Sequence, residues 1–368
     1  MAKEGSRNAA RVSAQVERYK RWLRRETVDR PMFGLFWEPD MAPVPGFVDR
    51  VGVGAEISPD MIEPEMCLDA IEKWYERGAS LAQDTFQPFM PGFGIPWMEA
   101  IAGCGVVAHP GSLWAQPVLD SYADRPALQL DRDNPWLMKL VEFLAALTDL
   151  SHGRFPITLP ALRGPLDTLA AMRTPQKMCL DLIEQPEHVR AILRDLTRLY
   201  IDLNELLLRD IPLFAEGYVT RLHMWAPDKA ITPQNDVSAM ISPAMYARFV
   251  LPGERQIMAQ FPYQSYHLHS TERHIVGPLL TVDRLSAMQM TLEHTLGGPG
   301  LEITLPVARR ILEQKPLILV MYDLTTAERC LQELPYAGLC LMLVPELTQD
   351  TVSSEYSGWL AEHCSRSA

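Results

Sequence analysis

Short apolar runs alternate with longer amphipathic stretches along this chain, and that rhythm constrains the fold more than any other feature. Such alternation indicates β-α units and a parallel sheet. Strand and helix follow each other four times in the second half, whereas the first half carries inserts at 39–80 and 87–134. The predicted strands are 31–37, 81–86, 155–159, 218–224, 264–269, 285–291, 317–322 and 339–344.

Amphipathic stretches and capping residues predict the helices between these strands. We expect helices at 18–25, at 135–150, at 175–209 with a break at Gln185-Pro186, and at 242–261 with Ser242 as N-cap. Three later helices are expected to open at Thr304, at Thr325 or Thr326, and at Ser353 or Ser354.

The number of strands decides the fold class. Eight strands with helices between them, in 368 residues, favour a single (β/α)₈ barrel. The first strand is not followed by a glycine-rich turn, which a Rossmann-type sheet would require. We therefore expect a barrel over residues 15–363, preceded by a flexible N-terminus at 1–14.

Bulk properties exclude several classes of partner. The formal net charge of −12 disfavours nucleic acid and anionic lipid. No apolar stretch is long enough to span a bilayer, and the N-terminus has no apolar region typical of a signal peptide. Six cysteines without a CxxC pair indicate reduced thiols and predict a cytoplasmic protein.

Polar residues collect where the predicted strands end, and in such barrels the reaction site lies at the carboxyl ends of the strands. We interpret His267, Asp236 and His223 as candidate catalytic residues. The candidate substrate-binding residues are Trp37, Asp84, Arg163, Trp225, Gln234, Tyr266 and Tyr322.

The pair His267-Leu268-His269 is the sharpest local feature. Residues two apart on a strand point to the same side, so both imidazoles should face the barrel mouth. There they could share a metal ion, transfer protons, or form hydrogen bonds as ordinary polar residues. Cys340 is either a further metal ligand or a core residue. His294, beside the loop 297–300, is expected to make local hydrogen bonds.

Several segments resemble the uroporphyrinogen decarboxylase superfamily, in particular its decarboxylase-like and cobalamin-associated methyltransferase branches. The resemblance runs from about residue 15 to 350. The segments that carry it are 27–31, 84–88, 91–94 followed by Trp114, 163–167, 234–238, 241–246, 249–252 and 266–269.

Two departures from the family pattern shape the functional prediction. The arginine-rich segment that follows the first strand in true uroporphyrinogen decarboxylases is the acidic stretch 36–40 here, which argues against a polycarboxylate tetrapyrrole as substrate. The zinc methyltransferases of the superfamily hold zinc with a His-x-Cys pair and a later Cys. His267, His269 and Cys340 resemble that pattern with one ligand exchanged.

The resemblance implies a methyltransferase that moves a methyl group between a small substrate or thiol and a corrinoid or other carrier. It implies zinc as metal, a corrinoid carrier protein as partner, and a homodimer. The alternative is a cofactor-free decarboxylase or lyase on a small carboxylic acid, with His267 or Asp236 as acid/base and Arg163 as carboxylate anchor. A non-catalytic binding barrel is the third reading.

Overall fold

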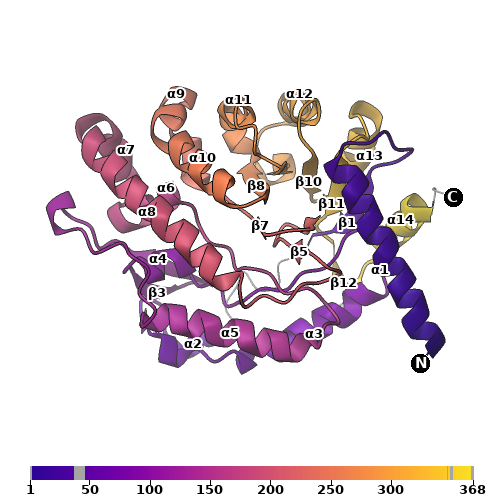
Figure 1. Ribbon diagram of the computed structural model, residues 1–368, viewed down its shortest axis with the longest axis horizontal. Helices are drawn as coiled ribbons and strands as arrows, with labels where there is room; N and C mark the ends of the chain where they lie inside the picture. Colours follow the sequence, from indigo (N-terminus) through magenta and orange to yellow (C-terminus); the bar gives the residue numbers. More distant parts are fainter. Residues whose placement is uncertain (1, 37–45, 346, 349–350, 366–368) are drawn as a thin grey trace.

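The computed structural model describes residues 2–36, 46–345, 347–348 and 351–365 (Figure 1). Its centre is a curled six-stranded sheet in which every neighbouring pair is parallel. The order is β1-β11-β10-β9-β8-β7. These strands span Met32–Leu35 (β1), Ala230–Ile231 (β7), Tyr263–His269 (β8), Ala287–Thr291 (β9), Leu317–Met321 (β10) and Leu339–Leu343 (β11).

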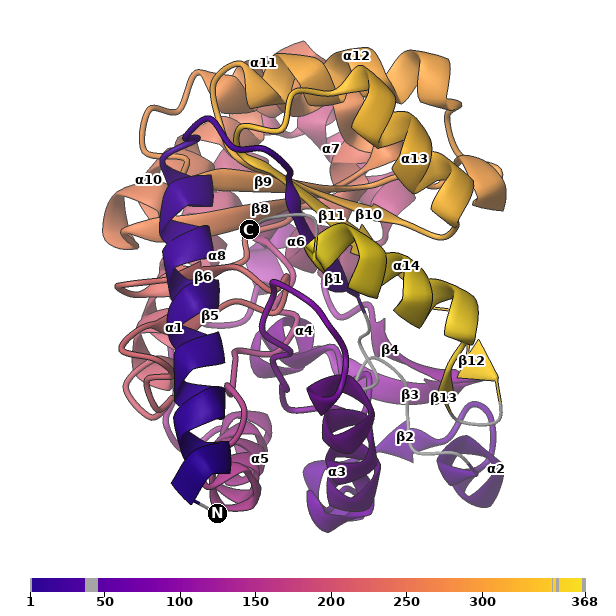
Figure 2. The same ribbon diagram turned by 90° about the vertical axis from the view of Figure 1, so that its right-hand side faces the viewer.

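Five predicted strands are confirmed with small shifts at their ends, namely β1, β8, β9, β10 and β11. Every residue of β9, β10 and β11 is buried. Burial of every residue is typical of parallel strands that are covered on both faces. Helices cover one face of the sheet, and the inserts of the first half lie on the opposite side of the molecule (Figure 2).

Two predicted strands, 81–86 and 155–159, do not form regular strands. They make only isolated pairings: the amide of Asp84 donates to the carbonyl of Phe33 at 2.8 Å, and Phe89 bridges Ile157. Side-chain hydrogen bonds take the place of the backbone pairing of a regular strand here. The Asp84 carboxylate, for example, accepts a hydrogen bond from the Phe33 amide at 3.0 Å. The described residues thus form a curled parallel sheet and not the predicted set of eight regular strands.

The prediction of a strand at 218–224 is wrong. The segment forms an antiparallel hairpin of β5 (Tyr218–Val219) and β6 (Trp225–Ala226). Its turn places His223 at a φ of 64°, a left-handed conformation that interrupts any strand. The short strand β7, which the sequence did not reveal, pairs with β8 instead.

The insert of the first half contains a second sheet that was not predicted. It is antiparallel, with β3 between β2 and β4. The strands span Glu56–Ile57 (β2), Gly105–His109 (β3) and Ser112–Gln116 (β4). Alternate residues of β3 are buried, as expected for a sheet with one covered face. Two further short strands, β12 and β13, span Leu347–Thr348 and Thr351–Val352.

The helices surround these sheets. The α-helices span Ala2–Leu23 (α1), Phe47–Val51 (α2), Glu65–Ala79 (α3), Trp97–Ile101 (α4), Pro135–Ser151 (α5), Pro165–Arg173 (α6), Pro175–Glu184 (α7), Pro186–Leu207 (α8), Pro243–Met245 (α9), Leu251–Gln260 (α10), Val276–Leu280 (α11), Leu301–Leu312 (α12), Leu324–Glu333 (α13) and Ser354–Ser365 (α14). Short 3₁₀ helices span Pro59–Met61 (η2), Tyr122–Asp124 (η3), Asp236–Met240 (η4), Ser270–Ile275 (η6) and His294–Leu296 (η7), and a π-helix spans Tyr246–Val250 (η5).

Helix starts show which capping predictions are correct. The Ser242 hydroxyl accepts the Met245 amide at 3.2 Å, which confirms that N-cap. The last helix also begins as predicted, because α14 starts at Ser354. The predictions at Thr304 and at Thr325 or Thr326 are wrong. Helix α12 begins earlier, after Gly300, so Thr304 lies inside it. The carboxylate of Asp323, and not Thr325 or Thr326, caps α13.

The N-terminal region is helical from Ala2, well before the basic cluster at which the sequence predicted a helix. Tyr19 and Trp22 anchor α1 through buried rings. The domain boundary at residue 15 stays a prediction. None of the described helices is long and apolar enough to cross a membrane.

Candidate functional site

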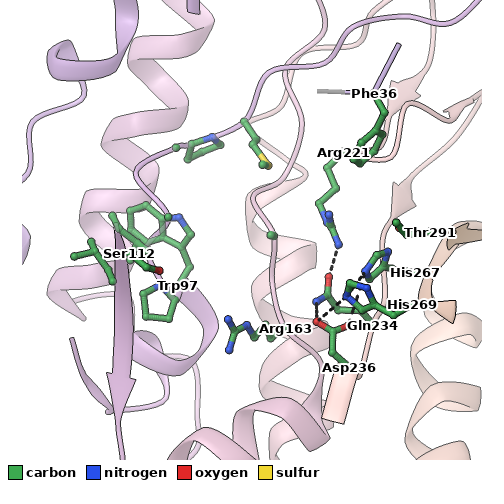
Figure 3. A pocket seen from close by; sticks show the side chains of 18 of the residues that line it. Phe36, Trp97, Ser112, Arg163, Arg221, Gln234, Asp236, His267, His269 and Thr291 are labelled. Carbon is green, nitrogen blue, oxygen red and sulfur yellow. Dashed lines mark hydrogen bonds and ion pairs between the residues drawn. The ribbon is translucent and has the colours of Figure 1, made fainter. Parts of the chain in front are cut away.

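A cavity of about 300 Å³ opens at the carboxyl ends of the sheet strands (Figure 3). Alternation along the strands aims one set of side chains into it. Trp97 and Ser112, from the insert, form the facing wall. Its polar lining residues are Ser112, Arg163, Arg221, Gln234, Asp236, His267, His269, Thr291 and Tyr322.

His267 lies deepest in the cluster and is held by Gln289 of the neighbouring strand. Gln289 Nε2 donates to Thr291 Oγ1 at 2.9 Å, so Gln289 Oε1 is the atom that meets His267 Nδ1. Nδ1 must therefore carry the proton, and Nε2 is left with a lone pair. Burial, together with the positive charge of Arg221, lowers the pKa of His267 to about 4.

His269 is oriented in the same way by a carboxylate. Its Nδ1 lies 2.6 Å from Glu293 Oε1, and Glu293 Oε2 accepts the amide and the hydroxyl of Ser270 at 3.1 and 2.8 Å. Nδ1–H therefore points to Glu293, and Nε2 points into the cavity. The hydrogen bond that His269 donates to Glu293 raises the pKa of His269, against the opposing effect of burial.

The two histidines and Asp236 converge on one point. His267 Nε2 and His269 Nε2 are 3.3 Å apart, and the Asp236 carboxylate oxygens lie 4.0 and 3.9 Å from them. Asp236 Oδ1 is buried and has no hydrogen-bond partner within the described part of the chain. Three ligand atoms, one from each residue, lie within 4.8 Å of one another, which is the spacing of a metal site.

Hydrogen bonds to neighbouring residues hold the segment that carries Asp236 in place. Asp167 on α6 accepts the backbone amides of Asp236 and Val237 at 2.9 and 2.8 Å. Gln234 Nε2 donates to Asp236 Oδ2 at 3.0 Å, and Gln234 in turn accepts from Arg221. The Asp236 carboxylate is thus held in place while one of its oxygens faces the histidines.

Two arginines give the cavity a positive side. Arg221 reaches in from the β5–β6 turn, and Arg163 precedes α6. The Arg163 side chain is 54% exposed and lies 3.4 Å from Glu99, whose side chain is fully buried. Burial raises the pKa of Glu99, and the nearby Glu99 carboxyl in turn raises the pKa of Arg163. Arg163 and Arg221 are suited to bind an acidic group of a substrate.

The structure brings six predicted site residues to the cavity. These are Arg163, Gln234, Asp236, His267, His269 and Tyr322. Trp37 lies outside the described residues.

Two predicted residues face away for simple geometric reasons. Tyr266 immediately precedes His267 on β8, so its ring points to the other face, where its hydroxyl donates to Glu254 at 2.9 Å. Cys340 stands near the amino end of β11, in register with Met32 and Ile318, and is buried in an apolar cluster. The structure does not bring Cys340 to the histidines.

Three further predicted residues serve packing and hydrogen bonding. His223 Nδ1 lies 2.8 Å from the carbonyl of Phe86, and burial lowers the pKa of its fully enclosed ring to about 4. The Trp225 indole donates to the carbonyl of Phe214 at 3.2 Å. Asp84 forms a buried ion pair with Arg30. None of the three lines the cavity. His294 makes the expected local hydrogen bond, to Thr326 at 3.1 Å.

The sequence reasoning missed several residues of the site, among them Gln289, Arg221, Trp97 and Ser112. Gln289 could have been found, because it is two residues before Thr291 and faces the same side of its strand. Arg221 carried no usable signal, since the predicted strand there is a hairpin. Trp97 and Ser112 come from the insert, whose placement against the sheet follows from tertiary packing alone.

One solved structure with a similar fold is a methyltransferase from Methanosarcina mazei, at a TM-score of 0.64 and 12% identity. The match covers 94% of this chain and 97% of that one. No protein-family model matches the chain, and no curated protein matches it. At this identity the likeness shows a shared fold over nearly the whole chain.

Proposed function

We propose that the cavity is the active site of a methyltransferase and that Asp236, His267 and His269 bind a divalent metal ion, with zinc as the first candidate. The proposal rests on the convergence of two imidazole Nε2 atoms and the unpartnered Asp236 Oδ1. Two histidines and a carboxylate are an accepted catalytic ligand set that leaves room for a substrate atom.

The residues present fit such an ion. Metal-binding histidines usually donate their second ring N–H to a carboxylate or carbonyl, as His267 and His269 do to Gln289 and Glu293. A proton between the two Nε2 atoms would satisfy one contact only, and Asp236 Oδ1 would stay unpaired. A cation satisfies all three groups. When bound, it would lower the pKa of a substrate thiol or polarise the substrate.

The chain's own residues account for binding and proton transfer. Arg163 and Arg221 bind an acidic group of a small substrate, while Gln234 and Tyr322 contact its body. A thiol must lose its proton before it accepts a methyl group, and the Asp236 carboxylate can receive that proton. The methyl group then moves between this substrate and a corrinoid or other carrier. The shared fold with a methyltransferase agrees with this proposal.

A second function, a metal-free decarboxylase or lyase on a small carboxylic acid, also has support. Glu293 raises the pKa of His269, so a proton on its Nε2 could serve as the general acid. Arg163 and Arg221 would hold the carboxylate. This reading needs neither a metal nor a carrier.

The test is a methyl-transfer assay with methylcobalamin as donor and small thiols as acceptors. The methyl group leaves cobalt without its bonding electrons, and sulfur gains it after losing a proton. We expect turnover by the zinc-loaded protein and none after chelation, with recovery on adding zinc. Release of carbon dioxide from small acids by chelated protein would support the lyase instead. The homodimer and the cytoplasmic location stay predictions; sedimentation analysis tests the first.

A further inference from the structure

A second cavity, of about 230 Å³, lies on the outer side of the molecule between α8 and the π-helix η5 with α10. Helices α8 and α10 lie side by side (Figure 1). Their approach is close because Gly253 faces Thr197, where a Cβ atom would come within 2.7 Å of the Thr197 hydroxyl. This cavity is separate from the site described above and shares no lining residue with it.

Three arginines line this outer cavity, in a chain whose net charge is −12. Arg190 and Arg194 are one turn apart on α8 and therefore project from the same face, where like charges repel. Arg248 comes from the π-helix, a feature that is frequent at functional sites. The guanidinium groups of Arg190 and Arg248 lie 5.3 and 4.9 Å from the centre of the Phe249 ring.

The charges of these arginines are only partly compensated. Arg190 pairs with Glu187 on its own helix. Arg194 and Arg248 have no acidic partner among the residues that the structure describes. Glu254 is the acidic residue of the lining, and burial raises its pKa to about 8. Its carboxyl is therefore mostly neutral at pH 7 and does not oppose an anion.

We propose that this outer cavity binds a small organic oxyanion, a phosphate monoester or a carboxylate, through Arg194 and Arg248. Planar guanidinium groups bind such oxygens in pairs. Apolar residues complete the walls and suit a ligand with an apolar body beside its charge; they are Pro165, Leu166, Leu193, Val250 and Pro252.

Two lining residues of the outer cavity also form hydrogen bonds with the segment that carries Asp236. Glu254 Oε1 accepts from Asn235, the residue before Asp236. The Leu166 amide donates to Asn235 Oδ1 at 2.8 Å. A ligand here would therefore lie against Leu166 and Glu254, which hydrogen-bond to the residue before Asp236.

Calorimetric titration with phenyl phosphate and with benzoate tests the proposal, and benzyl alcohol serves as the uncharged probe. We expect saturable binding of at least one anion, weakened at least tenfold in R194Q/R248Q. The matched control is Arg198→Gln, because Arg198 is exposed on the same helix but does not line the cavity. The same affinity in R194Q/R248Q and R198Q would overturn the proposal. So would binding that is lost in R163Q but kept in R194Q/R248Q, since it would belong to the first cavity.

Discussion

Two clusters of polar and charged residues differ in how completely their polar atoms are satisfied. Near the amino end of β1, the Asp84 carboxylate accepts hydrogen bonds from Arg30 at 2.5 and 3.1 Å and from the Phe33 amide at 3.0 Å. It also forms an ion pair with Arg18 at 3.2 Å. At the carboxyl ends of the strands, Asp236 Oδ1 has no partner and two imidazole nitrogens face each other. The first cluster is complete without a ligand, and the second needs one.

The completeness of hydrogen bonding distinguishes a structural cluster from a functional one, whereas the type of residue does not. Asp84 and His267 both lie in predicted strands, and both were candidate site residues. A buried carboxylate with its full set of donors stabilises the fold, whereas unsatisfied acceptors around a cavity cost stability unless something binds there. The predictions below test that division, in order of decreasing effect.

His267→Ala should abolish turnover, by more than about a thousandfold, because it removes both a metal ligand and a candidate base. Methyl transfer from methylcobalamin is the measurement. The control is His188→Ala, a histidine exposed on α8 and stacked on Tyr122. Activity in H267A within a factor of ten of wild type would rule out the site.

Asp84→Asn should destabilise the protein by about 3–5 kcal/mol, since it leaves a buried Arg30 without its counter-charge. Asp236→Asn should change stability by less than about 1 kcal/mol, because it removes an oxygen that has no partner in the metal-free protein. Urea unfolding of the chelated proteins measures both. Equal losses in the two variants would contradict the division between the clusters.

Glu293→Gln should weaken metal binding by about 10–100-fold, because a carboxylate that orients a ligating histidine also increases its basicity. Competition with a coloured chelator gives the affinity. Glu328→Gln is the matched control: it removes a carboxylate 3.5 Å from another histidine, His363, on the helices α13 and α14. An unchanged metal affinity in E293Q would show that Glu293 does not support metal binding.

Arg163→Gln should raise KM for an acidic substrate about tenfold and leave kcat nearly unchanged, as expected when a charged hydrogen bond to the bound substrate is lost. Metal affinity should not change. An unaltered KM would show that Arg221 alone, or neither arginine, binds the acidic group.

The sequence predicted the regular part of the sheet well because β10 and β11 are continuous apolar runs, and because β8 to β11 pair in the order in which they follow one another along the chain. It failed at 81–86 and 155–159, where side chains such as Asp84 replace backbone pairing. The hairpin depends on the left-handed backbone conformation of His223, which no sequence pattern predicts. In the site, strand alternation correctly paired His267 with His269, whereas Cys340 was assigned by resemblance and lies at the other end of its strand.

The metal content of the purified protein tests the central claim most directly. After incubation with zinc and removal of the excess, mass spectrometry should find one ion per chain in the wild type and little in D236N or H267A, while H188A keeps its metal. Chelation should remove the ion, and zinc should restore it. A wild-type protein that retains no zinc or other divalent metal, or that retains as much as D236N and H267A, would contradict the account.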